Sequence, residues 1–284
     1  MKQNKLILVL TLLISMVSLN AFADNVTFAD SNVKAICVNH WDTNGDGEIS
    51  LDEAAAVTTL SDYFKNNTSI TSFDELIYFT GLTGIGNFAW CSNLSSIKIP
   101  NTVTTIGTDA FAGCGLTSFT LPKSVVVYGD GPEGGLGALK DCRNLTSIMV
   151  EDGNTKYDSR ENCNAIIETA TNTLVSGCKN TVIPKTVTSI GYQAFRGSDI
   201  SDIEIPNSVT SIGYRAFWYA SLTSVKIPGS VTKIGDYAFD CSSLTSVSIA
   251  VKTPLIITET TFSNKANTTL YVPVGSKAAY EAAD

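Results

Sequence analysis

The sequence predicts a mostly β fold, a solenoid of stacked coils with a small helical unit in front of it. Two observations predict the solenoid: a segment of about 22 residues recurs along most of the chain, and its apolar residues alternate as they do in short strands. A third observation, a twelve-residue acidic loop between two helical patterns, predicts the helical unit.

The composition of the 284-residue chain argues against several classes of protein. Charged residues make up 16%, hydrophobic residues 44%, and 27 acidic against 19 basic residues give a net charge of −8. Binding to nucleic acid or to an anionic membrane needs clustered Lys and Arg, so we expect neither. The single histidine, His40, excludes a site made of several histidines. Serine and threonine take the place of the missing charge.

The first 23 residues have the features of an export signal. Lys2 and Lys5 precede an apolar run over residues 6–19, and residues 21–23 form the small-x-small pattern of a signal peptidase site. The run has about 14 residues, too few for the roughly 20 that span a bilayer. We therefore expect cleavage after Ala23, no membrane insertion of the mature chain, and a protein that is secreted, at the cell surface or in the periplasm. A retained membrane anchor is the alternative.

The repeat has the pattern L-x-x-I-x-I-P-x-x-V-x-x-I-G-x-x-A-F-x-x-C and is clearest in the copies that begin at Leu94, Leu116, Ile200 and Leu222. L-x-x-I-x-I forms a short strand, the proline ends its hydrogen bonding, and the second half turns the chain back. One coil cannot bury its own apolar side, so the coils must stack. We expect ladders of like residues, namely Ile97/Phe119/Ile148/Ile203/Val225/Val247 and Phe111/Phe195/Phe217/Phe239.

These residues resemble the leucine-rich repeats of the BspA-like type, which occur in bacterial surface proteins and in some parasitic protists. The resemblance covers roughly residues 70–284 and rests on the core L-T-S-V-x-I-P-x-S-V-T-x-I-G-x-x-A-F. It implies a right-handed, mostly β leucine-rich-repeat solenoid without long convex helices, and a role in adhesion or in binding host proteins.

The spacing departs from 22 residues in two places. The interval from Leu116 to Leu145 contains the glycine-rich segment 128–137, which lacks the Gly-Lys-Ser/Thr ending of a phosphate loop and is interpreted as an enlarged turn. The longer interval that follows predicts a hairpin inserted at about residues 157–180. A turn in its middle places Cys163 opposite Cys178, so a disulfide between them is a hypothesis.

The remaining repeat cysteines lie at nearly the same position, three residues after the Phe or its substitute, or two residues after it for Cys241. They are Cys91, Cys114, Cys142 and Cys241. We expect a ladder of small buried thiols and no catalytic cysteine, because the only histidine lies in the helical unit.

The acidic loop, residues 42–53, is the one motif with a specific chemistry. It matches the pattern D-x-[DN]-x-[DN]-G-x5-E, whose hard oxygens suit calcium. The predicted metal ligands are the side chains of Asp42, Asn44 and Asp46, the backbone carbonyl of Glu48, a water held by Ser50, and the carboxylate of Glu53. Calcium is the only cofactor that we expect. The alternative is an acidic turn that mimics the motif.

The flanks of the loop support a helix-loop-helix unit. Apolar residues recur at helical spacing before the loop, and Ser50 with Glu53 forms a capping box after it. Residues 30–60 resemble EF-hand and dockerin calcium sites. EF-hands usually pair and dockerins carry two loops, but here there is one, so cohesin docking is not expected and the affinity is about 10⁻⁴–10⁻³ M. His40 is expected to be a partly buried helix residue, not a ligand.

The chain is therefore divided into a signal peptide (residues 1–23), an EF-hand cap (residues 24–66) and the leucine-rich-repeat solenoid (residues 67–284). A short helix after Ser72 is expected to complete the cap, and another is expected to begin at about Ser276.

The surface of the solenoid is expected to be polar and rich in hydroxyl groups. Outward strand residues form a sheet about eight strands wide, roughly 40 Å across. They are Ser96/Lys98, Ser118/Thr120, Ser147/Met149, Asp202/Glu204, Ser224/Lys226 and Ser246/Ser248. Tyr192 and Tyr214 stack beside Trp218 and Tyr219 in an aromatic edge that either anchors a partner or completes the core.

The sequence therefore favours an exported, non-enzymatic interaction protein that binds host or matrix proteins, or other surface proteins, through its solenoid. The alternative is a calcium-dependent assembly or accessory module that joins other exported proteins. An enzyme is the least favoured, since the repeats offer no group of acid and base residues. The oligomeric state is not predicted.

Overall fold

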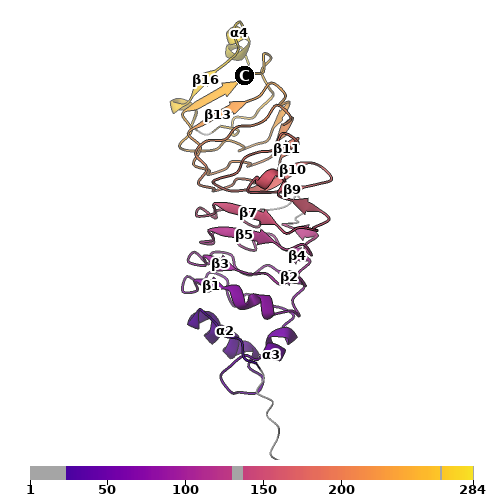
Figure 1. Ribbon diagram of the computed structural model, residues 1–284. Helices are drawn as coiled ribbons and strands as arrows, with labels where there is room; N and C mark the ends of the chain where they lie inside the picture. The colour runs from indigo at the N-terminus through magenta and orange to yellow at the C-terminus, as the bar shows by residue number, and fades with distance from the viewer. Residues whose placement is uncertain (1–23, 130–136, 263, 284) are drawn as a thin grey trace, which may run out of the picture.

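The computed structural model describes residues 24–129, 137–262 and 264–283. The predicted signal peptide (residues 1–23) and most of the glycine-rich segment lie outside the described residues. Figure 1 shows an elongated stack of coils with the N-terminal helices at one end. The fold is a mostly β solenoid of about 9 turns with few helices, as predicted.

Two helices flank the acidic loop at the N-terminal end: α2 (Ser31–Trp41) and α3 (Leu51–Ala56). The predicted capping box of Ser50 and Glu53 is present on α3. Val33, Cys37 and Ile49 are fully buried in the same core as the first coils. The helices therefore close the end of the solenoid instead of standing apart from it.

The strands form two columns along the solenoid. One column contains β1 (Ser72–Phe73), β3 (Ser96–Ile97), β5 (Ser118–Leu121), β7 (Ser147–Val150), β13 (Ser224–Ile227), β15 (Ser246–Ile249) and β16 (Thr269–Tyr271). The other contains β2 (Gly84–Ile85), β4 (Thr105–Ile106), β6 (Val127–Tyr128), β8 (Tyr157–Asp158), β9 (Ala165–Glu168), β10 (Thr173–Gly177), β11 (Ser189–Ile190), β12 (Ser211–Ile212) and β14 (Lys233–Ile234).

Four short helices complete the described chain. The helix expected after Ser72 is the 3-10 helix η1 (Asp74–Tyr78), and η2 (Arg160–Asn162) and η3 (Lys265–Asn267) are also 3-10 turns. The helix expected at about Ser276 is α4 (Lys277–Glu281). No helix among the described residues is long and apolar enough to cross a membrane.

Stacked phenylalanines run through the interior. Phe195, Phe217 and Phe239 stack with ring centroids 4.9 and 5.3 Å apart and nearly parallel planes, as predicted. The stack continues to Phe262, which the repeat pattern did not identify. Toward the N-terminus the coil of residues 138–142 lies between Phe111 and Phe195. It hydrogen-bonds to the coil of Phe111 on one side and to the coil of Phe195 on the other.

The predicted sheet of about eight strands is wrong, because its column of strands is broken. β1 pairs with β3, β5 with β7, and β13 with β15 and β16, but these groups are separate. Beyond β7, pairing in this column resumes only at the isolated bridge between Glu204 and Lys226. The break beyond β7 coincides with the inserted segment, whose strands β8, β9 and β10 join the other column.

The inserted segment contains the expected antiparallel pair. Glu168 of β9 pairs with Thr173 of β10, but the register shifts between Leu174 and Ser176. The hypothesis of a disulfide is wrong: Cys163 and Cys178 are both buried free thiols. The shift is the physical reason, since one extra residue in β10 removes the facing positions that the hairpin turn alone predicts.

Candidate functional site

The acidic loop is closed by its own side chains. Asp42 accepts hydrogen bonds from Gly45 N–H to Oδ1 (2.7 Å) and from Gly47 N–H to Oδ2 (2.8 Å). Both glycines have φ near +80°, a conformation that favours glycine. The loop therefore turns sharply around the Asp42 carboxylate.

The next two predicted ligands repeat this arrangement. Asn44 Oδ1 accepts from Asp46 N–H, and Asp46 Oδ1 accepts from Glu48 N–H, both at 2.8 Å. The side chain of Glu48 turns away to an ion pair with Lys34 at 2.6 Å. The side chain of Glu48 is therefore engaged outside the loop, and the role of its backbone carbonyl as a ligand stays a prediction.

Glu53 ties the end of the loop to its beginning. Its Oε1 accepts from Thr43 N–H (2.8 Å) and Thr43 Oγ1 (2.7 Å), and its Oε2 accepts from Ser50 N–H and Oγ (both 2.9 Å). Burial acts to raise the pKa of Glu53, but the hydrogen bonds from Ser50 and Thr43 outweigh it and lower this pKa to about 2. The carboxylate is therefore ionised at neutral pH.

The predicted ligands lie in one loop, but their side chains do not converge on a single point. Among the residues that the structure describes, no three His, Cys, Asp or Glu side chains form a group that could hold a metal ion. The oxygens of Asp42 and Asp46 each accept one N–H, and a carboxylate oxygen has two lone pairs. Asp42 and Asp46 therefore keep lone pairs for a cation, whereas the two oxygens of Glu53 already accept five hydrogen bonds, from Thr43, Asn44 and Ser50.

The exit of the loop pairs with the N-terminal segment. Val26 N–H donates to Ile49 O at 2.8 Å, and Leu51 N–H donates to Asp24 O at 2.9 Å. Ile49 is fully buried. In a paired EF-hand the second loop lies beside the first. Here the N-terminal segment takes that place and pairs with the exit of the single loop.

His40 differs from its prediction in exposure. It lies in α2 as expected, but it is exposed, and its ring stacks on Tyr63 with centroids 3.5 Å apart. The histidine therefore covers the exposed Tyr63 instead of entering the core.

The predicted aromatic edge is part of a larger surface. We call it the aromatic–arginine surface, made of Tyr192, Arg196, Tyr214, Arg215, Trp218, Tyr219 and Tyr237. The guanidinium carbon of Arg215 lies 3.8 Å from the Trp218 ring centroid and that of Arg196 lies 4.4 Å from it. Trp218 Nε1 donates to Asp240 Oδ2 at 3.0 Å. Cation–π contacts and a hydrogen bond therefore hold the indole in one place.

Tyr219 is the outermost member of this surface. Its ring stacks on Trp218 at 4.6 Å, and 52% of the residue is exposed. Its φ of 57° lies in the left-handed region, as does that of the equivalent residue in other coils (Trp90, Gly113, Asp141 and Gly197), so this turn belongs to the repeat. Because the exposed ring of Tyr219 rests on a tryptophan that is itself held in place, it is the strongest candidate anchor on the solenoid.

Sequence reasoning missed Arg196, Arg215 and Tyr237. Arg215 and Tyr237 occupy the same repeat position, the second x of I-G-x-x-A-F, one coil apart. Reading that position down the stack places Arg215 between Gln193 and Tyr237. Its guanidinium carbon lies 5.2 Å from the Tyr237 ring and 4.7 Å from the ring of Tyr214, its neighbour in the chain.

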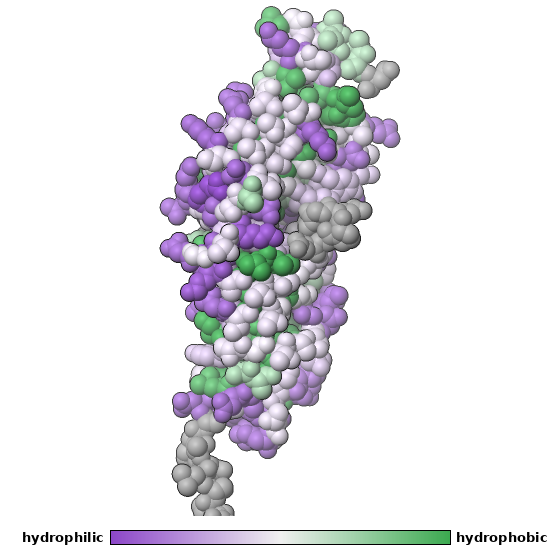
Figure 2. All heavy atoms as spheres, turned by 90° about the vertical axis from the view of Figure 1, so that its right-hand side faces the viewer, coloured by the Kyte–Doolittle hydropathy of each residue, from purple (hydrophilic) through white to green (hydrophobic). Residues whose placement is uncertain are grey.

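The threonine columns have a structural role. The Oγ1 atoms of Thr188, Thr210 and Thr232 each donate to a backbone carbonyl of the preceding coil. Figure 2, which looks onto the side where β2 and β4 lie, shows a mostly pale surface with separated green patches. These hydroxyl groups are used between coils, so this face offers few donors to a ligand.

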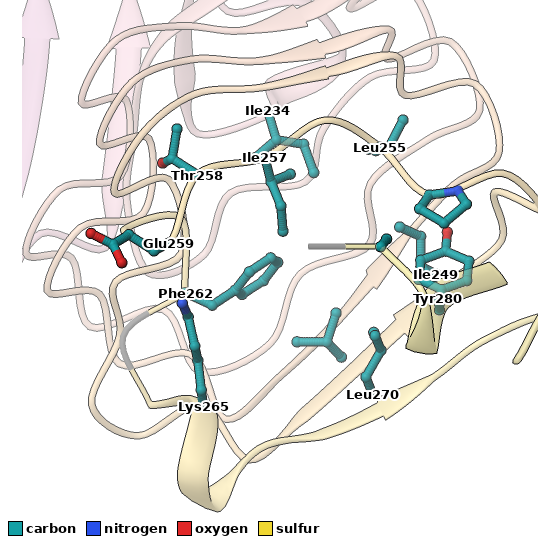
Figure 3. A pocket seen from close by; sticks show the side chains of 13 residues that line it. Ile234, Ile249, Leu255, Ile257, Thr258, Glu259, Phe262, Lys265, Leu270 and Tyr280 are labelled. Carbon is teal, nitrogen blue, oxygen red and sulfur yellow. The ribbon is translucent and has the colours of Figure 1, made fainter. Parts of the chain in front are cut away.

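The C-terminal end contains an apolar cavity of about 290 Å³. Figure 3 shows Ile257, Phe262 and Leu270 around it, with Tyr280 of α4 at its side. Tyr280 Oη donates to Val251 O at 2.7 Å, which fastens α4 over the last coil. The cavity is lined partly by core side chains, such as Ile234 and Val247, and partly by exposed ones, such as Ile257 and Leu270.

The stacked coils and their ladders define a leucine-rich-repeat solenoid. A family model described as the BspA type leucine rich repeat region matches six copies, over residues 58–174 and 172–281. The chain therefore belongs to the BspA-type leucine-rich repeat family. Proteins with such repeats generally mediate protein–protein interactions. A search of curated proteins finds no match to the chain.

Two solved structures have a similar fold. A leucine-rich repeat protein from Eubacterium ventriosum is 22% identical, with a TM-score of 0.51, over 72% of this chain and 64% of its own. A leucine rich cell surface protein from Faecalibacterium prausnitzii is 23% identical, with a TM-score of 0.51, over 81% of this chain and 69% of its own. The chain thus spans less than two thirds of the Eubacterium protein, and the likeness concerns the fold.

Proposed function

We propose that the protein is an exported, non-enzymatic interaction protein that binds other proteins through its solenoid, host or matrix proteins and other surface proteins among them. The observation that carries the proposal is the aromatic–arginine surface. Its exposed Tyr219 rests on a tryptophan that two arginines hold in place. Aromatic and arginine side chains dominate the binding energy of protein interfaces, and preorganised ones lose little entropy on binding.

We propose further that the acidic loop is an EF-hand calcium site. The ligands are Asp42, Asn44, Asp46, the Glu48 carbonyl, a water on Ser50, and Glu53. Hard oxygens at alternate positions and the two glycines in left-handed conformation support this set. Bound calcium would neutralise the acidic side chains and join the end of α2 to the start of α3, which stiffens the cap.

The alternative is a calcium-dependent assembly module. The exposure of residues 43–47 at the end of the molecule favours it, because a partner can reach the loop there. In this case the loop itself, not the solenoid, would contact other exported proteins.

An export signal with cleavage after Ala23 belongs to the same proposal. Cleavage there leaves Asp24 as the first residue, and its carbonyl accepts the Leu51 N–H at the loop exit. The repeat family and the cell-surface description of the Faecalibacterium protein support a location outside the cytoplasm.

Capture of proteins from a host-matrix extract, with and without calcium, tests the proposal. We expect Tyr219→Ala to reduce capture at least about tenfold, the effect of losing one hot-spot residue. Tyr271→Ala is the matched control, since Tyr271 is similarly exposed (57%) but lies on β16. If Asp42→Ala and Glu53→Ala abolish capture while the solenoid stays folded, the alternative is correct.

A further inference from the structure

The broken strand column leaves one edge of β7 without a strand partner. β7 pairs with β5 along its whole length, and no other strand of the described residues pairs with it. A groove of about 460 Å³ lies along β7, and its other wall comes from residues 152–154, 157–160, 162 and 164. We call it the β7 groove.

The peptide groups of Ile148 and Val150 face this groove. Glu151 N–H donates to Leu121 O at 2.9 Å, and alternate residues of a parallel strand bond to opposite neighbours. The repeat equivalent of Val150 is Ile227, whose carbonyl accepts the Ala250 N–H of the next coil at 2.9 Å. At β7 that neighbouring strand is replaced by the groove.

The groove carries excess negative charge. Three carboxylates line it, those of Glu151, Asp152 and Asp158, and one cation, Arg160. Arg160 is held by Asp158 through Nε to Oδ1 (2.9 Å) and Nη2 to Oδ2 (2.7 Å). Because this pair neutralises itself, Glu151 and the exposed Asp152 set the charge that a ligand meets.

The wall opposite β7 is held in place before any ligand arrives. Asn154 Nδ2 donates to Pro122 O (3.0 Å) and Val125 O (2.9 Å), which fastens one end. Arg160 Nη1 donates to Asn172 Oδ1 at 2.8 Å, which fastens the other. A rigid wall lowers the entropy lost on binding.

We propose that the β7 groove binds an extended segment of a protein partner that carries lysine or arginine, added to β7 as a further strand. Main-chain hydrogen bonds to Ile148 and Val150 supply affinity, and the carboxylates of Glu151 and Asp152 select basic side chains. This deepens the proposed function, on which it rests, but it uses a surface other than the aromatic–arginine surface.

The test uses labelled peptides and fluorescence anisotropy on the full chain. The probe is acetyl-TKVKTKV-amide, and one control peptide replaces each lysine by glutamate. Two further control peptides carry N-methyl groups on alternate amides, one on the odd-numbered residues and the other on the even-numbered residues. We expect the lysine peptide to bind. The glutamate peptide, and the one N-methylated peptide whose methyl groups block the amides that pair with β7, should bind at least about tenfold more weakly.

Two variants locate the site. Val150→Pro removes an N–H that faces the groove and not β5, so the pairing with β5 is retained. Asp152→Lys reverses a charge of the groove, and Asp202→Lys makes the same change in the other part of the column. We expect Val150→Pro and Asp152→Lys to weaken binding of the lysine peptide at least about tenfold, and the control Asp202→Lys to leave it unchanged.

Three results would overturn the inference. Equal binding of both N-methylated peptides and the parent excludes strand addition, and equal binding of the lysine and glutamate peptides excludes selection by charge. A dimer in sedimentation that Val150→Pro abolishes makes a second copy of the chain the occupant. Each of these results leaves the proposed function standing, because its own test depends on Tyr219.

Discussion

At the scale of single residues, Asp30 joins the N-terminal helices to the solenoid. Its Oδ1 caps α2 by accepting from Asn32 N–H (2.8 Å), and its Oδ2 accepts from Thr71 N–H (2.6 Å) and Thr71 Oγ1 (2.8 Å). Thr71 directly precedes β1, the first strand of its column. One carboxylate therefore fixes both the start of a helix and its position on the first coil.

We predict that Asp30→Ala lowers the free energy of unfolding by about 1–3 kcal/mol, the cost of losing a helix cap and leaving buried donors unpaired. Chemical denaturation measures the change. Asp52→Ala, an exposed acidic residue in the first turn of α3, is the matched control and should change stability far less. Equal effects of the two substitutions would show that the bridge to Thr71 contributes nothing.

The same residue predicts a pH dependence. Burial acts to raise the pKa of Asp30, but the hydrogen bonds from Thr71, Asn32 and Val33 outweigh it and lower the pKa below its ordinary value of 3.8. A lowered folded-state pKa stabilises the fold above pH 3.8, and this contribution is lost as the pH falls further. The stability difference between the wild type and Asp30→Asn should therefore shrink below about pH 3.8. A difference that is constant down to pH 2 contradicts this.

The cysteine thiols are predicted to be inert in the folded protein. Burial raises the pKa of Cys142 and of Cys241 to about 12, and their thiols donate to the carbonyls of Phe111 and Phe217. Only the thiolate reacts with alkylating reagents. Iodoacetamide at pH 8 should label neither cysteine before unfolding and both afterwards, as read by peptide mass spectrometry. Labelling of the native protein at either residue would contradict the ladder.

At the scale of the repeated element, the glycine of I-G-x-x-A-F lets successive coils approach. A Cβ at Gly213 would lie 2.8 Å from the backbone carbon of Gly191, and one at Gly235 would lie 2.5 Å from Tyr214 N. Such contacts force the coils apart, because the obstructing atoms belong to the backbone. The first coil has no such contact: a Cβ at Gly86 meets nothing within 4 Å.

We predict that Gly235→Ala destabilises the protein by about 1–3 kcal/mol, the usual cost of overpacking. Gly86→Ala is the control at the same repeat position and should be neutral or slightly stabilising. Thermal unfolding of the two variants against the wild type decides the matter. Similar melting temperatures for both variants would mean that coil contact does not explain the glycine.

The periodic elements were predictable from the sequence, and the broken column was not. Phe195, Phe217 and Phe239 recur at the coil length, so stacking alone determines their contacts. The free edge of β7 depends on which column the inserted strands join. The local sequence pattern of the insertion does not show this, because the pairing is made with residues of other coils. The same limit explains the disulfide error, because the register shift after Leu174 leaves no turn signal. Arg215 was missed because no sequence pattern shows that its side chain lies over the rings of Tyr214 and Trp218 in its own coil and of Tyr237 in the next.

At the scale of the whole molecule, the apolar interior forms two clusters that meet at the insertion. One runs from the N-terminal helices to Cys178, and the other runs from Cys163 to the last coils. Solenoid stability is approximately a sum over neighbouring coils, so damage in one part stays local. The insertion is therefore the natural boundary between two cooperative units.

We predict that Phe217→Ala costs about 3–5 kcal/mol, as for other buried phenylalanines, and that the loss is confined to the C-terminal cluster. Hydrogen–deuterium exchange should be faster in β11–β15 and unchanged in β1–β5. Uniformly faster exchange along the chain would mean that the solenoid unfolds as one unit.

The central claim, an interaction solenoid closed by a calcium-binding cap, is tested most directly by hydrogen–deuterium exchange with and without millimolar calcium. We expect calcium to slow exchange in α2, α3 and residues 42–53, to change it less at β1 and β3, and to leave it unchanged from β11 to β16. Glu53→Gln should remove the calcium effect, and magnesium should not replace calcium, because its small octahedral shell does not suit seven flexible oxygens. No change of exchange at residues 42–53 with calcium, or the same change in Glu53→Gln, would show that this loop does not bind calcium.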